Sequence, residues 1–215
     1  MRKTFLAITL FLAFSKAALA QFGNCTASEM RTYVDSATGN TITMLTDTMK
    51  NDRFLYQTDP MWTADGKYLL FRSSSRGNDK EVESTLPNGE KRKWTPTQIY
   101  FIEMATGKII QATEGPNLGS AFLANKTNRM FVSRKEKENW NMYVMDLNKF
   151  FADVKQEKVG KPSAYETFIG TFPTEMGRPG GYAVDCNDDY AYITVEREGT
   201  EEEKERMMKN AFLPE

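Results

Sequence analysis

The chain has 215 residues, carries 28 basic and 29 acidic side chains, and contains no histidine, so its formal net charge is −1. The lack of histidine excludes, within this chain, catalysis by a histidine base and metal sites with histidine ligands. The near-balanced charge argues against a general nucleic-acid binder, which needs a basic excess to neutralise phosphates. A polyanionic ligand would instead need a local cluster of basic side chains.

Residues 1–20 have the features of a secretory signal peptide. Arg2 and Lys3 precede an apolar run from Phe5 to Phe14, and Ala18-Leu19-Ala20 fits a cleavage site. The run is too short to cross about 30 Å of hydrocarbon, and no later segment is long and apolar enough, so we expect no stable membrane span. We predict cleavage after Ala20 and a secreted or periplasmic location. Cleavage would remove three basic residues and no acidic ones, leaving a net charge of −4.

Two kinds of β-hairpin recur along residues 21–215. The first kind is an apolar strand followed by a polar turn, and it occurs at Arg31–Asn40, Gln98–Lys108 and Asn141–Lys149. The second kind is an aromatic residue, a turn with Asp or Asn, and an apolar strand, and it occurs at Asp59–Gly77, Phe122–Phe131 and Tyr182–Tyr192. Short apolar runs bounded by turn residues are typical of strands. The aromatic residues of the second kind stand at positions 62, 122 and 182, sixty residues apart.

Three segments interrupt this alternation. A polar insert from Ser73 to Thr97 separates the two hairpins of the first unit, and the stretch from Phe151 to Gly180 fills the gap after the second unit. The segment Glu198–Asn210 pairs acidic and basic residues at helical i,i+4 spacing, which predicts a short solvated helix. Both cysteines, Cys25 and Cys186, lie in the exported part, where disulfides persist, but the sequence leaves their pairing open.

Two hairpins per repeat make four strands, which is the sequence signature of a β-propeller. We therefore predict an all-β fold of four-stranded antiparallel blades for residues 21–215, with about three blades plus an opening hairpin. A single antiparallel sandwich with coincidentally spaced hairpins is the alternative. A propeller closes with about four to eight blades, so this one would be partial. Closure would need C-terminal blades of a longer chain, which we favour, or another copy of this chain.

Three motifs stand in a fixed order in the N-terminal half of the chain. Their residues are Asp35, Thr38, Gly39, Leu45 and Thr46, then Tyr56 and Gln57, then Asp65, Gly66, Leu69, Leu70 and Phe71. This order resembles the opening of the oligogalacturonate lyase family, which consists of seven-bladed propellers of pectin catabolism. The resemblance extends over nearly all of residues 21–215. The last motif is common to propellers of the TolB type, whereas the order of the three is more particular to the lyases.

The resemblance implies β-elimination of oligogalacturonides. That reaction requires the uronate carboxylate to be neutralised by a divalent metal or by Arg or Lys, while a base removes the neighbouring proton. The family uses a manganese-like ion, held by histidines and a glutamine of its later blades. None of these histidines carries over to this chain, so we expect neither a cofactor site nor turnover from this segment alone. Its catalytic residues stay unassigned.

Two other functions fit the same sequence. The first is a non-catalytic, TolB-like propeller module that binds a protein or glycan in the cell envelope. The second, less favoured, is a propeller that precedes a serine peptidase domain. Further blades with histidine and glutamine placed for a metal would favour the lyase, and further blades without them would favour the binding module.

Basic, aromatic and amide side chains near strand ends are the candidate contacts for an acidic oligosaccharide. They are Arg53, Tyr56, Gln57, Arg72, Arg76, Arg134 and Arg197. An arginine forks onto a carboxylate, and a tyrosine stacks on or hydrogen-bonds a sugar. Basic residues repeated at one end of corresponding strands could form the positive patch that a polyanion requires. The structural alternative is packing for Tyr56 and Arg53 and a solvated sheet edge for the other arginines.

Overall fold

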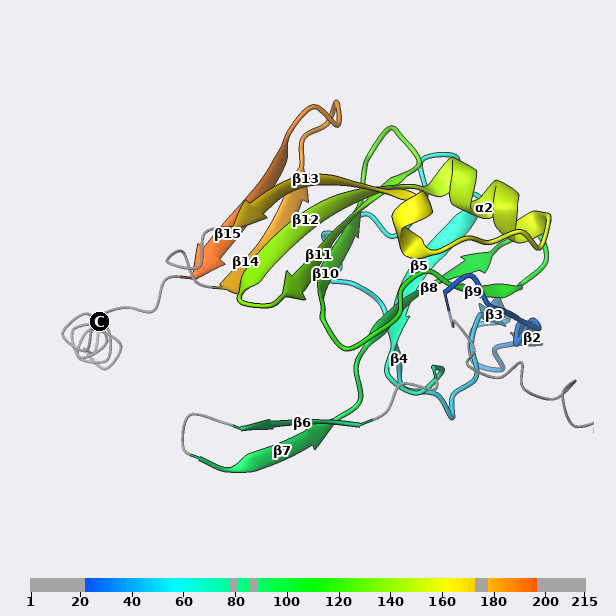
Figure 1. The fold of residues 1–215 in the computed structure, drawn as a ribbon. Helices are drawn as coiled ribbons and strands as arrows, with labels where there is room; N and C mark the ends of the chain where they lie inside the picture. Colours follow the sequence, from blue (N-terminus) through cyan, green and yellow to red (C-terminus); the bar gives the residue numbers. More distant parts are fainter. Residues whose placement is uncertain (1–21, 78–80, 86–88, 173–177, 197–215) are drawn as a thin grey trace, which may run out of the picture.

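The computed structural model describes residues 22–77, 81–85, 89–172 and 178–196, which form an all-β fold around two antiparallel sheets (Figure 1). The first sheet has the order β1-β9-β8-β5-β4 and the second the order β10-β11-β12-β13. The strands of the first sheet are β1 (Cys25–Thr26), β4 (Asp52–Arg53), β5 (Tyr68–Ser73), β8 (Gln98–Glu103) and β9 (Ile109–Gln111). Those of the second are β10 (Leu118–Leu123), β11 (Arg129–Glu136), β12 (Asn139–Asp146) and β13 (Glu166–Phe172).

Three further hairpins complete the described strands. They are β2 (Arg31–Val34) with β3 (Thr41–Met44), β6 (Val82–Thr85) with β7 (Lys91–Trp94), and β14 (Arg178–Val184) with β15 (Ala191–Glu196). The third hairpin lies beside the second sheet, with β14 against β10. The predicted fold class is confirmed: the sheets are antiparallel blades of a partial propeller. The predicted signal peptide and the predicted helix at 198–210 lie outside the described residues.

One turn geometry begins each of the three units. In each unit, the last residue pair before the turn joins the first two strands. These residue pairs are Trp62–Leu69, Leu123–Met130 and Val184–Ala191. In each enclosed turn the N–H of the first residue donates to the carbonyl of the last, from Thr63 to Tyr68, from Ala124 to Arg129 and from Asp185 to Tyr190. The repeat is therefore real, but the equivalent positions are 62, 123 and 184. The predicted equivalence of 62, 122 and 182 is displaced by one and two residues, because it matched aromatic identity rather than turn register.

The first two sheets share one apolar core, which the helix α2 (Leu147–Lys155) covers (Figure 1). Leu70 of the first sheet and Val132 of the second sheet both pack in this core. The ring of Phe151 on α2 stacks on Tyr68 with 3.6 Å between centroids. The stretch after Phe151, predicted only to fill a gap, also contains a 3-10 turn (Pro162–Ala164) and β13, the fourth strand of the second blade. It is thus an integral part of that blade.

The third hairpin is joined to the second blade by a second apolar cluster and by one carboxylate. Phe122 stacks on Tyr182 with 4.9 Å between ring centroids. Asp188 is 7% exposed and has a φ of 64°. Its carboxylate accepts the backbone N–H groups of residues 125–127 and the hydroxyl of Thr127, all at 2.7–2.9 Å. Burial raises the pKa of Asp188, but these hydrogen bonds outweigh burial and lower it.

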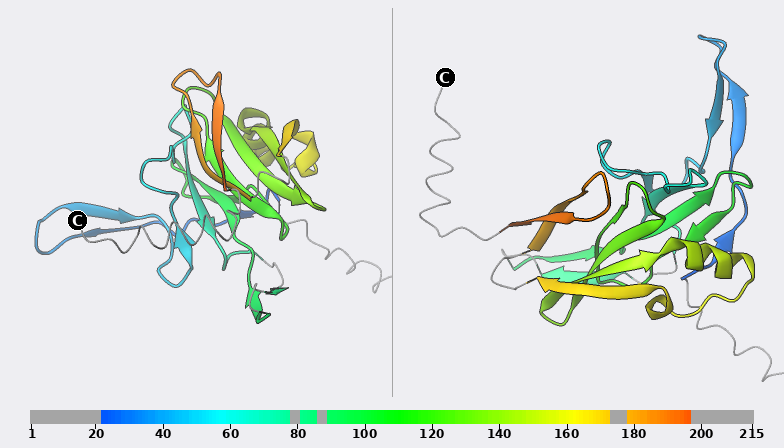
Figure 2. Two further views of the ribbon diagram at one scale, coloured as in Figure 1. Left: turned by 90° about the vertical axis from the view of Figure 1, so that its left-hand side faces the viewer. Right: turned by 90° about the horizontal axis from the view of Figure 1, so that it is seen from above.

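Two hairpins project from the body of the fold. β2–β3 stands away from the first sheet (Figure 2), and β6–β7 extends from the insert between β5 and β8 (Figure 1). Cys25 and Cys186 are both exposed free thiols, so the disulfide that the sequence left open is not formed. Among the described residues, no helix has the length and hydropathy of a membrane span.

Candidate functional site

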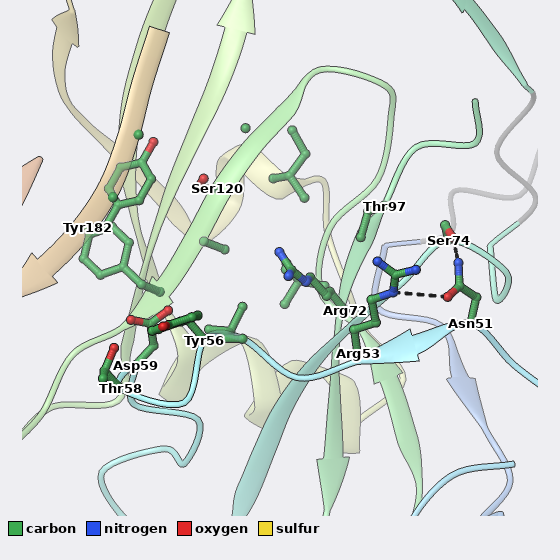
Figure 3. A pocket seen from close by; sticks show the side chains of 18 of the residues that line it. Asn51, Arg53, Tyr56, Thr58, Asp59, Arg72, Ser74, Thr97, Ser120 and Tyr182 are labelled. Carbon is green, nitrogen blue, oxygen red and sulfur yellow. Dashed lines mark hydrogen bonds between the residues drawn. The ribbon is translucent and has the colours of Figure 1, made fainter. Parts of the chain in front are cut away.

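The inner edge strands of all three units border one hollow of about 870 Å³ (Figure 3). β4, β10 and β14 each lie at an edge of their sheet and pair with the strand that follows the opening turn of their unit. Residues between Asn51 and Asp59, at the ends of β5 and β7, in Leu118–Phe122 and in 180–182 form its walls. In a propeller the first strands of the blades face the central channel, so this hollow corresponds to the channel side of the fold.

Two arginines form one wall of the hollow. Arg53 on β4 is the direct cross-strand partner of Arg72 on β5, so both side chains leave the same face of the sheet. Arg72 is the exposed position in a strand whose other residues are buried. The Nε of Arg53 donates to Asn51, whose amide donates to Ser74 (Figure 3). Neither guanidinium forms an ion pair with any residue in the described ranges, so no described carboxylate pairs with either positive charge at the hollow.

The opposite wall combines aromatic and small residues. The hydroxyl of Tyr182 lies 2.9 Å from that of Ser133, which also accepts the N–H of Ser120 at 2.9 Å. The strands β10 and β14 depart from regular pairing at this wall, β10 between Leu118 and Ala121 and β14 between Pro179 and Tyr182. Such bulges redirect the backbone. A Cβ at Gly119 would come within 2.5 Å of both Ser133 and Trp140, so glycine is needed for this close approach.

The rim carries the remaining polar and aromatic groups. Tyr56 is 68% exposed and Trp94, at the end of β7, is 37% exposed. Both line the hollow together with Asp59, and Figure 3 shows Tyr56 and Asp59 close together. Gln57 is exposed in the turn after Tyr56 and is not part of the lining. The rim therefore offers aromatic faces and one carboxylate, which can accept hydrogen bonds from sugar hydroxyls.

Arg76, another predicted contact, lies in a separate place. Its guanidinium donates to both oxygens of Glu29 and both oxygens of Asp52 at 2.6–2.9 Å. The side chains of Arg76, Asp52 and Glu29 are 6%, 10% and 24% exposed. Burial lowers the pKa of Arg76, but these hydrogen bonds raise it by more, so the pKa lies above its ordinary value. This half-buried triad joins the segment before β2 to β4 and to the end of β5.

Arg134, a further predicted contact, is also away from the hollow. Arg134 on β11 forms a bidentate ion pair with the buried carboxylate of Glu166 on β13. Arg197 lies outside the described residues. Of the seven candidate contacts, the structure thus brings Arg53, Tyr56 and Arg72 together at one hollow. It places Gln57 beside them and separates Arg76 and Arg134.

Most of the lining residues were not among the candidates from the sequence, including the polar and aromatic side chains of Asp59, Trp94, Ser120 and Tyr182. A usable signal was present in the small residues before the aromatic position of two repeats, Gly119-Ser120-Ala121 before Phe122 and Gly180-Gly181 before Tyr182. Small residues at this point of an inner strand leave room beside the channel.

The residues present do not fit a manganese ion. The chain contains no histidine, and no group of three or more Cys, Asp or Glu side chains within the described ranges is placed to hold a metal. The lining of the hollow has a single carboxylate, Asp59, and two arginines, whose positive charges would repel a cation. We therefore assign no step of any reaction to a metal held by these residues.

Comparisons with known proteins bear on the fold. No family model and no curated protein matches the chain. Among solved structures, the chain is similar to an oligogalacturonate lyase in complex with manganese, at 20% identity and a TM-score of 0.53. It is also similar to an oligogalacturonate lyase from Vibrio parahaemolyticus, at 21% identity and a TM-score of 0.52. Each likeness covers 77% of this chain and 35% of the other, so the predicted resemblance is confirmed for the fold, and the chain spans about a third of these neighbours.

Proposed function

We propose that the hollow binds an acidic oligosaccharide of the oligogalacturonate class, as part of an exported, oligogalacturonate lyase-like propeller. The observation that carries this proposal is the pair Arg53 and Arg72, which face the hollow without a carboxylate partner among the described residues. Like charges directly opposite each other destabilise a sheet, so their placement favours an anionic ligand. The solved structures of similar fold, titled oligogalacturonate lyases, support this ligand class.

The chemistry of the hollow suits a uronate chain. A guanidinium binds a carboxylate through two parallel N–H···O bonds, and two adjacent arginines can hold two neighbouring uronates or clamp one. Tyr56, Trp94 and Tyr182 offer flat apolar faces with polar edges for sugar rings. In an elimination, neutralising the carboxylate makes the adjacent proton more acidic, and this is the part that Arg53 and Arg72 can supply. We assign no base.

A binding module without turnover is the second candidate, because the described residues offer arginines for a carboxylate but no set of metal ligands. The two candidates differ in their product. A lyase releases an unsaturated uronate, whose conjugated double bond absorbs ultraviolet light, whereas a module leaves the oligosaccharide intact. For this chain alone we expect binding and no unsaturated product, with or without added manganese. Metal-dependent product formation would contradict that expectation.

The binding test uses trigalacturonate and isothermal titration calorimetry at low ionic strength. Replacing Arg72 by Met removes one charged fork, worth about 1.5–3 kcal/mol, so the affinity should fall at least about tenfold. Lys135→Met is the matched control, because Lys135 is exposed on β11, lies outside the hollow and carries the same charge. It should bind like the unmodified chain.

The ligand provides a second control for charge recognition. The fully methyl-esterified trigalacturonate has the same sugar rings but no carboxylates, so its binding should be much weaker than that of the acid. Equal affinity for the ester and the acid, or an Arg72→Met variant that binds as well as Lys135→Met, would contradict the proposal.

A further inference from the structure

The hairpin β6–β7 starts at the border of the hollow. It belongs to the segment that connects β5 to β8, and both ends of this segment line the hollow, through Ser74 at its start and Thr95 and Thr97 at its end. Trp94, the last residue of β7, lines the hollow as well. Figures 1 and 2 show the hairpin extending from the body on the same side as β14–β15, whose strand β14 contributes to the opposite wall. The hairpin therefore continues the surface of the hollow outward.

The pairing register divides the hairpin into two faces, because side chains alternate between the two faces of a strand. One face, which we call the tryptophan face, carries Val82, Ser84, Arg92 and Trp94. The other, the lysine face, carries Glu83, Thr85, Lys91 and Lys93. Since Trp94 lines the hollow, the tryptophan face is the one that meets the hollow at the base of the hairpin.

The cations on the two faces have different surroundings. On the lysine face, Lys91 forms an ion pair with Glu83 at 2.7 Å, and Lys93 is the direct cross-strand partner of the same glutamate. The four residues of the tryptophan face include no acidic side chain. Arg92 is exposed, lies opposite Ser84, and forms no ion pair with a described residue. Its guanidinium is therefore available to an external anion.

Arg92 lies beyond the hollow rather than in it. It precedes Trp94 by two residues, which is about 7 Å along the strand, and it is not part of the lining. The volume of the hollow, about 870 Å³, is within the range of about 300–1,000 Å³ for sites that enclose a small ligand. A long oligosaccharide must consequently extend out of the hollow, and on the tryptophan face it would meet first an aromatic ring and then a guanidinium.

We propose that the tryptophan face of β6–β7 is an outer subsite, in which Arg92 binds the carboxylate of a uronate that lies outside the hollow. This inference rests on the proposed function, because it extends the same site to longer acidic oligosaccharides. The ring of Trp94 gives the sugar chain an apolar face between the two parts of the site, and Arg92 supplies two N–H donors to one carboxylate. Arg92 thus favours long chains over short ones, whereas Arg53 and Arg72 bind both.

The test compares two chain lengths by isothermal titration calorimetry, with trigalacturonate and hexagalacturonate as ligands. An ionic strength of about 0.15 M largely screens charges more than about 8 Å apart, which limits general effects of net charge. Arg92→Met should leave the affinity for trigalacturonate unchanged. It should lower the affinity for hexagalacturonate about two- to fivefold, as expected for an exposed ion pair. The unchanged binding of trigalacturonate also shows that the variant is folded.

Lys93→Met is the matched control, because it removes one positive charge from the adjacent residue of the same strand but from the lysine face. It should bind both oligosaccharides like the unmodified chain. Equal weakening of hexagalacturonate binding by Lys93→Met and Arg92→Met would overturn the outer subsite, since the effect would then be one of general charge. Unchanged hexagalacturonate binding by Arg92→Met, or equal weakening for both chain lengths, would overturn it as well.

The outer subsite and the proposed function fail in different ways. If trigalacturonate binding depends on Arg72 while hexagalacturonate binding does not depend on Arg92, the proposed function stands and the outer subsite is wrong. If neither oligosaccharide binds, or if trigalacturonate binds without dependence on Arg72, the proposed function is wrong and the outer subsite falls with it.

Discussion

Arg72 near the end of β5 and Arg76 just after it stand four residues apart, yet they occupy different environments. Arg72 faces the hollow beside a second arginine and forms no ion pair with the described residues. Arg76 is buried between two carboxylates. Both were predicted as contacts for an acidic ligand from the sequence alone. The charge of a side chain therefore indicates a binding site only where the fold supplies no countercharge.

The difference arises from the segments that return to the end of β5. Glu29 and Asp52 precede Arg76 by 47 and 24 residues and meet its guanidinium through four hydrogen bonds. Arg72 instead lies opposite Arg53 on the edge strand, and the neighbouring carboxylate of Asp52 is already paired with Arg76. One arginine consequently holds the fold together and the other is available to a ligand.

Removing the buried arginine should have the largest effect on the free energy of unfolding. Arg76→Met leaves the half-buried carboxylates of Glu29 and Asp52 without their charged partner. Because water can reach Glu29, the loss should be about 1.5–3 kcal/mol, the range for hydrogen bonds to charged groups, rather than the about 3–5 kcal/mol of a fully buried pair. Urea denaturation followed by tryptophan fluorescence measures the change. Arg76→Lys keeps the positive charge but not the forked guanidinium, so its stability should lie between that of the unmodified chain and that of Arg76→Met. If Arg76→Met unfolds at the same urea concentration as Arg72→Met, the two arginines do not differ in the way described.

The stabilisation by Arg76 should also depend on pH. The hydrogen bond from Arg76 is the main cause that lowers the pKa of Glu29 below its ordinary value of 4.5. Because the folded pKa is depressed, this contribution is complete above pH 4.5 and is lost as the pH falls below it. The difference in unfolding free energy between the unmodified chain and Arg76→Met should therefore shrink on acidification. A difference that stays constant from pH 7 to pH 3 would contradict the role of Glu29.

The sequence predicted the elements that local patterns determine. Turn residues and short apolar runs identified the hairpins and their alternation, because each hairpin is specified by a few adjacent residues. The register between repeats was displaced because Phe122 and Tyr182 resemble Trp62 in type but not in position relative to the turn. Aromatic identity is a weaker guide to register than the number of residues in the turn.

Contacts between distant segments were beyond the reach of the same patterns. Asp188, in a turn interpreted as a simple hairpin, binds the turn of the neighbouring blade about 60 residues away. Arg134 was grouped with Arg72 by its place at a strand end, but the outer strand β13 brings Glu166 to it. In the candidate site the sequence identified the arginine wall and Tyr56. It missed the wall from β10 and β14, which depends on how three blades assemble.

Removing the arginine at the hollow should have the smallest effect on stability, and in the opposite direction. Arg72→Met relieves the repulsion between directly opposed like charges, so unfolding should become more difficult by about 0.2–1 kcal/mol, the usual range for cross-strand pairs. Urea denaturation in low salt measures this gain, which high salt should reduce because both guanidinium groups are exposed.

The partner arginine tests whether repulsion is the cause. Arg53→Met removes the same repulsion, so adding it to Arg72→Met should bring little further gain, and the two effects should not add. Additive gains would mean that each arginine is unfavourable for its own reason. A loss of more than about 1 kcal/mol for Arg72→Met would show that this side chain holds the fold as Arg76 does, since mutations at exposed positions without structural contacts usually change stability by less.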